Sequence, residues 1–338
     1  MCDMRCGYCF YSDISNSREI PFVGFMSNDT AAAIIKNIYQ SLSPGDTINF
    51  GFQGGEPCLR GLDFFEFFVS TAKENLSQGV KINYALQTNG LMIDEKWCDF
   101  FKKNKFLIGL SLDGDSALHN QNRKDTHGKG TYNKVMQAKR LLENHKVKYN
   151  ILCVLTSEIA RRGKKIWEFI LKEKIRYIQF IPCLEPLNAT PGDIHLTPER
   201  FYRFYSDIFP LWKKELNVRI RFFDDLIIIA NNGKGVTCGM NGRCFPQFII
   251  EADGSVYPCD FYVLDEYKAS NLTEVRLEEA FNTLITGDFF APTQLPKRCK
   301  TCKYNIWCNG GCRRMANTVY GNPCGMKLFL DEYGEYFK

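Results

Sequence analysis

The chain opens with three cysteines, Cys2, Cys6 and Cys9, at the spacing C-x3-C-x2-C. A closed zinc site needs four ligands held close together. No fourth ligand is at hand, because the next cysteine is Cys58 and the first histidine is His119. Three thiolates on one short loop suit an iron–sulfur cube with one iron left open to a substrate or cofactor. A zinc knuckle that borrows a distant ligand is the alternative.

Composition and charge indicate a globular protein of the cytoplasm. Hydrophobic residues make up 45% of the chain and charged residues 24%, which is typical of soluble domains. The formal net charge of +5 looks spread out, and its densest runs, 102–105 and 161–165, fall in or beside expected helices. Solvated helix faces explain both runs, so nucleic-acid binding is not expected. No apolar run reaches membrane-spanning length and no signal peptide is visible, so we expect a cytoplasmic protein with no membrane partner.

The remaining cysteines strengthen the expectation of bound metal. The chain has fifteen cysteines, of which eight lie between Cys238 and Cys324 and four are isolated. Disulfides are rare in the cytoplasm, so clustered thiols there indicate metal, whereas isolated ones are mostly small core residues. Eight thiolates complete two four-cysteine sites. These sites could hold two iron–sulfur clusters or two structural zinc ions.

Apolar segments alternate with amphipathic helices over most of the chain. This alternation predicts a parallel sheet covered by helices. Helices are expected at 28–42, 62–75, 94–104, 132–145, 164–173 and 198–215. Strands are expected at 47–52, 80–86, 106–111, 148–155 and 176–182.

Polar motifs with glycine follow three of the expected strands. They are Gly54-Gly55-Glu56-Pro57, Gln87-Thr88-Asn89-Gly90 and Leu112-Asp113-Gly114. In parallel α/β folds the edge formed by the strand ends carries the active site. The opening cysteine loop also precedes a helix, so we expect a strand before it and infer that the chain begins one strand late. The alternation stops near Asn232, which predicts a second domain from there on.

Tyr8, just before Cys9, completes the pattern C-x3-C-x-aromatic-C, which resembles the signature of the radical S-adenosylmethionine (SAM) enzymes. That resemblance implies a partial (β/α)6 TIM-like barrel, here over residues 1–231 and with its first strand missing. It also implies that the open iron chelates SAM, which an electron cleaves to methionine and a 5′-deoxyadenosyl radical. The run C-x2-C-x5-C-x3-C followed by a further cysteine resembles the SPASM extension, here over residues 232–338.

The resemblance implies three [4Fe–4S] clusters and assigns their ligands. Cys2, Cys6 and Cys9 hold the SAM-binding cluster. One auxiliary cluster is held by Cys238, Cys244, Cys259 and Cys312. The other is held by Cys299, Cys302, Cys308 and Cys324.

The contacts of the superfamily with SAM can be carried onto matching positions. Gly55 and Glu56 meet the amino group of SAM, and Tyr8 lies by its adenine. The planar fork of Arg123 suits a carboxylate. The implied cofactor-binding residues are Tyr8, Gly55, Glu56, Ser111, Arg123 and Leu184.

Eight motifs together resemble the anaerobic sulfatase-maturating enzymes: CDMRCGYCFY, GFQGGEP, LQTNG, GLSLDG, NRKD, CGMNGRC, DGSVYPCDFY and CNGGCRR. This resemblance implies oxidation of an active-site Cys or Ser of a sulfatase to Cα-formylglycine. Asp260 is then the expected base, with Tyr11, Gln53 and Gln87 as further substrate-site candidates. The implied partners are a sulfatase polypeptide and an electron donor such as a flavodoxin or ferredoxin.

The chain departs from the pattern of this family at three places. The first strand is missing, Cys58 stands where the family often has Thr, and the interval from Cys312 to Cys324 is short. Three other functions remain as alternatives. They are another SPASM peptide modifier that forms thioethers or other crosslinks, a non-catalytic iron–sulfur electron carrier, and a zinc-stabilised binding module.

Overall fold

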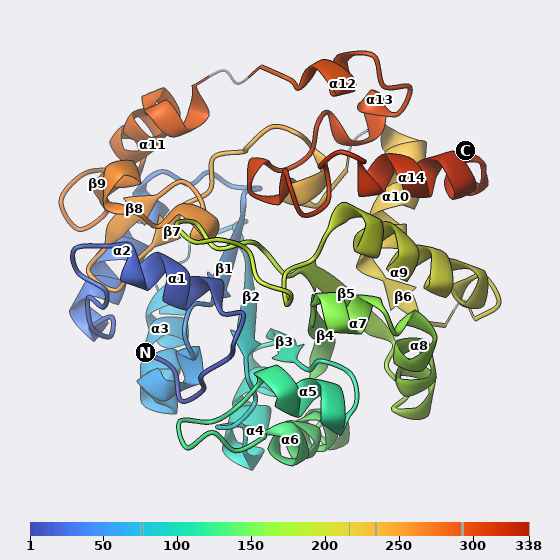
Figure 1. Cartoon of the computed structure of the whole chain (residues 1–338). Helices are drawn as coiled ribbons and strands as arrows, with labels where there is room; N and C mark the ends of the chain where they lie inside the picture. The colour runs from blue at the N-terminus through green and yellow to red at the C-terminus, as the bar shows by residue number, and fades with distance from the viewer. Residues whose placement is uncertain (75, 77, 216, 234, 292–293, 338) are drawn as a thin grey trace.

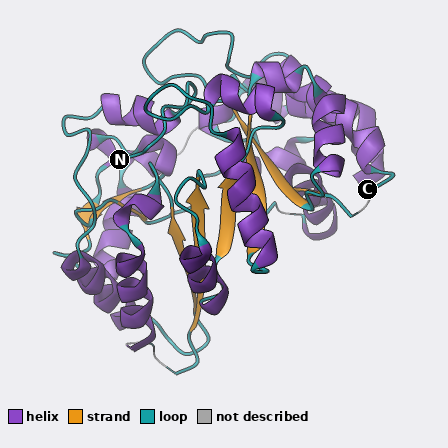
Figure 2. Cartoon of the chain, turned by 90° about the horizontal axis from the view of Figure 1, so that it is seen from below, coloured by secondary structure: helices purple, strands orange, loops and turns teal. Residues whose placement is uncertain are grey.

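The computed structural model describes residues 1–338 except 75, 77, 216, 234, 292–293 and 338. Its main sheet has six parallel strands whose order in space equals their order in the chain (Figures 1 and 2). Parallel strands joined in sequence by helices form an opened (β/α) barrel, so the predicted fold class is confirmed. The strands are β1 (Thr47–Phe52), β2 (Lys81–Thr88), β3 (Leu107–Ser111), β4 (Lys148–Leu155), β5 (Tyr177–Pro182) and β6 (Arg219–Ile220).

Helices cover the outside of this sheet (Figure 1). Several begin at a side-chain cap, as where the Ser27 hydroxyl accepts a hydrogen bond from the Thr30 amide. In the predicted helices, the buried faces carry the apolar residues of the 3.6-residue period, whereas the helix over 221–232 was not predicted. The long helices are α2 (Asn28–Gln40), α3 (Leu62–Glu74), α4 (Glu95–Lys103), α6 (Tyr132–Asn144), α8 (Gly163–Lys172), α9 (Pro198–Trp212) and α10 (Arg221–Asn232), and the short ones are α1 (Phe10–Asn16), α5 (Ser116–Asn122) and α7 (Ser157–Ala160).

Five of the six strands lie where the sequence predicted them. The sixth, β6, has only two residues and therefore offers no periodic pattern to detect. The helix expected over 198–215 ends at Trp212 and contains Pro210 in its last turn. Asn75, the last residue of the helix expected over 62–75, lies outside the described residues.

The cysteine loop is anchored without a strand before it. Within residues 1–46, all of which are described, no strand of the main sheet is formed. Instead Met4 makes an isolated bridge to Asp125, and the Arg5 amide donates to the Lys124 carbonyl at 2.8 Å. The segment that carries Arg123 therefore holds the cysteine loop in place.

The described residues of the C-terminal part add a small antiparallel sheet and four α-helices. The sheet pairs β7 (Ile249–Ile250) with β8 (Ser255–Tyr257), and β8 with β9 (Ser270–Asn271). The helices are α11 (Leu277–Thr286), α12 (Lys297–Lys300), α13 (Asn305–Cys308) and α14 (Gly325–Tyr333). The predicted domain boundary at 231/232 falls at the end of α10. Helix α14 packs across it against α9, so one hydrophobic core continues through both parts.

None of the described helices is long and apolar enough to cross a membrane. The four isolated cysteines, Cys58, Cys98, Cys153 and Cys183, are buried as predicted.

Phe329 of α14 provides a test of how far the two parts share a core. Its ring is fully buried against Phe222 and Phe223 of α10 and Phe209 of α9. Because Phe329→Ala leaves a cavity there, we expect it to lower the free energy of unfolding by about 3–5 kcal/mol in urea titrations. Leu328→Ala, at a half-buried neighbour on the same helix, should cost less. Equal costs for the two variants would contradict the shared core.

Candidate functional site

The three opening cysteines lie together on the loop that leads into α1. Burial raises the pKa of the Cys6 thiol to about 11, with a further increase from Cys9 and Cys2 and an opposing effect of Arg123. Burial also raises the pKa of Cys2, and Cys9 again adds to it. The three sulfurs therefore lie within electrostatic range of one another, as ligands of one cluster must. Iron would favour the thiolate forms that burial alone disfavours.

Glu56 is a buried carboxylate at the polar edge of the sheet. One of its oxygens accepts hydrogen bonds from the Cys58 amide at 2.9 Å and the Thr88 hydroxyl at 3.0 Å. The other accepts from the Asn89 amide at 2.7 Å. Burial raises the pKa of Glu56 in spite of these bonds. The Gln87-Thr88-Asn89-Gly90 motif thus fixes the Glu56 carboxylate. The hydrogen bond from position 58 comes from the backbone amide, so it would form with either Cys or Thr at this position.

The glycine before Glu56 is required by a close approach of backbone. Gly55 has a φ of +59°, and a Cβ there would lie 2.3 Å from the Met1 carbonyl oxygen. The Glu56 amide donates to the same oxygen at 2.9 Å. A side chain at position 55 would therefore push the cysteine loop away from the Gly-Gly-Glu turn.

Arg123 and Tyr8 meet at a residue that the sequence did not single out as part of the site. The Arg123 Nε donates to the Asp113 carboxylate at 2.9 Å and Nη2 at 3.3 Å. The Tyr8 hydroxyl donates to the same carboxylate, and the Arg123 guanidinium lies 5.5 Å from the centre of the Tyr8 ring. Burial raises the pKa of Tyr8. Asp113 belongs to the Leu112-Asp113-Gly114 motif after β3. Its place in this motif was the only feature of the sequence that pointed to a role for Asp113 in the site.

Ser111 and Leu184 mark the same edge of the sheet. Ser111 is the last residue of β3, and Leu184 lies two residues beyond β5. Leu184 is buried and Ser111 half-buried. The predicted SAM contacts thus come from the carboxyl ends of the parallel strands, although their role in binding SAM stays a prediction.

Asp260 lies beside two of the predicted substrate-site residues. The Gln53 side-chain amide donates to the Asp260 carboxylate at 3.1 Å. Burial raises the pKa of Tyr11, and the charge of Asp260 raises it further. Burial also raises the pKa of Asp260 itself. Gln87 is exposed on β2, whose Leu86 pairs with Phe52, the residue before Gln53.

Aromatic rings bring Asp260 and the opening cysteine loop together. Phe10, directly after Cys9, packs edge-on against Phe261, directly after Asp260, with ring centres 4.8 Å apart. Cys9 and Cys259 both add to the raised pKa of Tyr11, for which burial is the main cause. The expected base therefore lies between the opening cysteines and one of the C-terminal ones.

The eight C-terminal cysteines separate into two sets. We call Cys238, Cys244, Cys259 and Cys312 the first auxiliary set and Cys299, Cys302, Cys308 and Cys324 the second auxiliary set. Burial raises the pKa of Cys238 to about 11 and that of Cys312, and other thiols of the first set add to both. Burial raises the pKa of Cys308 to about 12, with a further increase from the other three thiols of the second set. The structure thus groups the cysteines as the resemblance implied, while their role as ligands stays a prediction.

Tyr320 lies between the two sets. It is buried, and its hydroxyl donates to the carbonyl of Gly239, the neighbour of Cys238, at 2.8 Å. Burial raises the pKa of Tyr320, and Cys308, Cys312 and Cys324 add to that effect. Thiols of both sets are therefore within electrostatic range of this one ring.

The arrangement of the thiols bears on the choice between zinc and iron–sulfur clusters. In the part of the chain that is described, no three His, Cys, Asp or Glu side chains are placed to hold a single metal ion. Tetrahedral zinc would need sulfurs about 3.8 Å apart. A cube of four irons and four sulfides is larger and spreads its thiolates further. Metal analysis distinguishes the two kinds of site.

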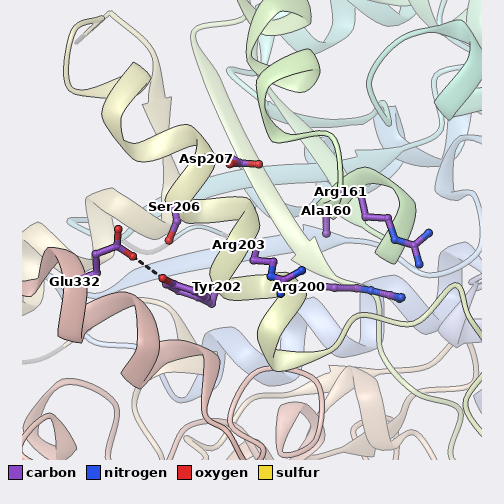
Figure 3. Close-up of a pocket in the computed structure, with 8 residues that line it drawn as sticks. All are labelled: Ala160, Arg161, Arg200, Tyr202, Arg203, Ser206, Asp207 and Glu332. Atoms are coloured by element: carbon purple, nitrogen blue, oxygen red, sulfur yellow. Dashed lines mark hydrogen bonds between the residues drawn. The ribbon is translucent and has the colours of Figure 1, made fainter.

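A cavity of about 440 Å³ lies away from these residues, between the barrel helices and α14 (Figure 3). Across it the Tyr202 hydroxyl donates to the Glu332 carboxylate at 2.6 Å. None of the predicted site residues lines it. Its described lining is Ala160, Arg161, Arg200, Tyr202, Arg203, Ser206, Asp207 and Glu332.

Comparison with known proteins identifies both parts of the chain. Residues 1–161 match the model of the radical SAM superfamily, and residues 238–303 match that of an iron–sulfur cluster-binding domain, SPASM. The whole chain is 41% identical to a cysteine-type anaerobic sulfatase-maturating enzyme of Clostridium novyi, covering 91% of that protein. It is 31% identical to a serine-type anaerobic sulfatase-maturating enzyme of Klebsiella aerogenes, with 96% of this chain and 80% of the relative covered.

A solved structure supports the same relationship. It is described as native anSMEcpe with bound AdoMet and a Kp18Cys peptide, and it is 36% identical to this chain. The two structures superimpose with a TM-score of 0.91 over 100% of this chain and 95% of the other.

The Asp113–Arg123 pair provides a test of the site's internal support. Asp113→Asn leaves the Arg123 charge buried beside a neutral side chain, so we expect the free energy of unfolding to fall by about 3–5 kcal/mol in urea. The double variant Asp113→Asn/Arg123→Met removes the unpaired charge and should recover part of this loss.

Lys165→Gln is the matched control, because Lys165 pairs with Asp115 at 2.7 Å on the surface. Its cost should stay below about 1 kcal/mol. If Asp113→Asn costs no more than this control, the buried pair does not support the site.

Proposed function

Because the chain belongs to the family of anaerobic sulfatase-maturating enzymes, which are radical SAM enzymes with a SPASM domain, we propose that it oxidises an active-site cysteine of a sulfatase to Cα-formylglycine. The higher identity to the cysteine-type relative than to the serine-type relative supports cysteine as the target. The observation that carries the proposal is the position of Asp260, which lies between the opening cysteines and the first auxiliary set.

Three [4Fe–4S] clusters and SAM fit the cysteines and the polar edge of this chain. Bound at the opening cysteines, SAM would supply the radical that removes a hydrogen atom from Cβ of the target residue. Gly55 lets the opening loop approach the turn closely, and Glu56 is held in place to accept a hydrogen bond from the amino group of SAM. Arg123 already donates to Asp113 and keeps further N–H groups for the carboxylate of SAM. Tyr8, Ser111 and Leu184 complete the proposed cofactor contacts.

Asp260 takes up the second proton of the oxidation. Conversion of a cysteine to its thioaldehyde removes two protons and two electrons. One of each leaves as the hydrogen atom from Cβ, the thiol proton goes to Asp260, and one electron remains to be passed on. Water then replaces sulfur and releases hydrogen sulfide. Because burial raises the pKa of Asp260, its carboxylate is a stronger base than an exposed one.

Gln53 and Tyr11 position this base. Gln53 donates to one oxygen of Asp260, and the Cys259 thiol lies 3.8 Å from the other. The Tyr11 phenol lies within electrostatic range of the same carboxylate. Gln87 is exposed on β2, the strand that pairs with β1. The substrate peptide would therefore enter the open face of the barrel between β1, β2 and Asp260.

Asp260→Asn separates cleavage of SAM from oxidation of the substrate. In anaerobic assays on a sulfatase peptide with cysteine at the target position, the variant should still produce 5′-deoxyadenosine. Formylglycine, measured by mass spectrometry, should fall by about 100-fold or more, because a positioned base is lost. Asp288→Asn, at an exposed position, is the control and should match the wild type.

The same assay tests the proposed function itself. The wild type should convert the cysteine peptide faster than a matched serine peptide and leave an alanine peptide unchanged. Formylglycine formation by Asp260→Asn at the wild-type rate would remove Asp260 from its role. No formylglycine from the wild type on either peptide would overturn the proposed function.

Metal analysis tests the cluster count. Three [4Fe–4S] clusters correspond to about twelve irons per chain in protein prepared without oxygen. The triple variant Cys2→Ala/Cys6→Ala/Cys9→Ala should lose about a third of the iron and all SAM cleavage. Cys98→Ala, at a buried isolated cysteine, should lose none. One or two zinc ions per chain in place of iron would contradict the assignment.

A further inference from the structure

The positive charge of this chain is concentrated in one segment. Residues 289–330 contain seven Lys and Arg and no Asp or Glu, whereas the whole chain carries a formal net charge of +5. The expectation that the positive charge is spread out is therefore wrong, because it considered the net charge of the whole chain and not that of each segment. Six of the seven cations are exposed. Five of them lie close in sequence to cysteines of the second auxiliary set, and we call these five the basic face: Lys297, Arg298, Lys300, Lys303 and Lys327. The sixth, Arg313, lies over the ring of Phe289 and is not part of this face.

The basic face surrounds the second auxiliary set. Helix α12 carries Lys297, Arg298 and Lys300 on either side of Cys299. Lys303 directly follows Cys302, and Lys327 follows Cys324 by one helical turn. Three of the four cysteines of the set thus have basic neighbours in sequence.

Contacts show that cations from different elements gather here. The Lys303 ammonium contacts one oxygen of Asp331 at 3.0 Å, and the Lys327 ammonium contacts the other. One carboxylate is thus shared by two cations, and the five cations of the face outnumber the three exposed carboxylates that follow directly after this segment, Asp331, Glu332 and Glu335. The hydrogen bond with Asp331 raises the pKa of Lys327, and the Cys302 thiol contributes to the same shift. Cys299 and Cys302 are only partly buried, so a cluster held there would lie near the surface.

The proposed base, Asp260, lies at the opposite end of a line of residues from the basic face. Asp260 adjoins Cys259 of the first auxiliary set, and Tyr320 lies between that set and the second one. The order from substrate to surface is therefore Asp260, the first set, Tyr320, the second set and the basic face. In Figure 1, α12 and α13 lie at the outer rim of the molecule, far from α4 and α6.

We propose that the basic face docks a small acidic electron-carrier protein, which accepts the one electron that remains from each substrate oxidation. The proposal rests on the proposed function and names its redox partner by chemical class. For each cysteine oxidised, one electron leaves with the hydrogen atom from Cβ, and the other reduces the carrier by one electron. The basic face would attract an acidic carrier and orient it over the partly exposed cysteines.

The surface also has the mixed character of a transient interface. Ile306 on α13 is 75% exposed and supplies an apolar contact beside the cations. Redox complexes have small interfaces and depend on electrostatic attraction, so they form and separate quickly. A nucleic acid would be attracted by the same charges, but the described aromatic residues next to them, Tyr304 and Trp307, are buried and so do not offer an open stacking surface. The basic side chains border a predicted redox centre, which favours the electron carrier.

The test measures binding of a purified acidic ferredoxin to the reconstituted holoenzyme. Lys297→Glu/Lys300→Glu should weaken the Kd by at least about tenfold at low salt, since two attractive charges become repulsive. Lys327→Glu, on a different helix, should weaken it in the same direction. The control is Lys96→Glu/Lys103→Glu, an equal change of charge at exposed positions on α4, and should stay within about twofold of wild type. Iron content and the urea midpoint verify that each variant is folded and loaded.

Three outcomes would overturn the proposal. The first is equal ferredoxin affinity for the α12 variant and the α4 control. The second is single-stranded oligonucleotide binding at the basic face that is tighter than ferredoxin binding. The third is a raised KM for the sulfatase peptide in the α12 variant with unchanged ferredoxin affinity, which would make the face a substrate-docking surface.

Failure of the proposed function is detected separately. With dithionite as the reductant, the wild type needs no carrier protein to begin turnover. Absence of formylglycine under those conditions would overturn the proposed sulfatase-maturating activity. The binding measurements on the basic face need only the cluster-loaded protein, so they can succeed or fail independently of this activity.

Discussion

The arrangement of the site depends on one constraint, the parallel direction of all six strands of the main sheet. Each strand ends at the same edge, so segments far apart in sequence meet there. Glu56 follows β1, Asn89 follows β2 and Asp113 follows β3, and hydrogen bonds tie the first two together and Asp113 to Arg123. The opening cysteine loop rests on this edge through Met4 and Asp125. The predicted cofactor site is therefore built by the sheet, with the cysteine loop laid across it.

The two auxiliary sets extend this site through the C-terminal part. Cys308 belongs to one set and Cys312 to the other, although only a short turn separates them. Binding of two clusters would therefore fix the same segment twice and hold the substrate end and the basic face at a set separation. The aromatic packing of α14 on α9 and α10 adds a hydrophobic connection between the two parts. Metal ligation would thus stabilise the same arrangement as the core packing.

Periodic patterns in the sequence predicted strands and helices, but they did not predict contacts between segments. Five strands and most long helices followed from apolar spacing, whereas β6 is two residues long and has no period. Asp113 was visible as part of a turn motif, but its contacts with Arg123 and Tyr8 depend on tertiary placement that spacing does not contain. The pairing of the eight C-terminal cysteines came from family resemblance, since many pairings fit the same spacing. The basic face could have been found from sequence, because a long acid-free segment is visible without a structure.

The central claim is that this chain removes a hydrogen atom from Cβ of a sulfatase cysteine by means of SAM. The most direct measurement uses a sulfatase peptide whose target cysteine carries deuterium at Cβ. Mass spectrometry of the 5′-deoxyadenosine formed under anaerobic conditions should detect one deuterium for each formylglycine produced. If the peptide is oxidised while the deoxyadenosine stays free of deuterium, the hydrogen comes from elsewhere and the account is contradicted.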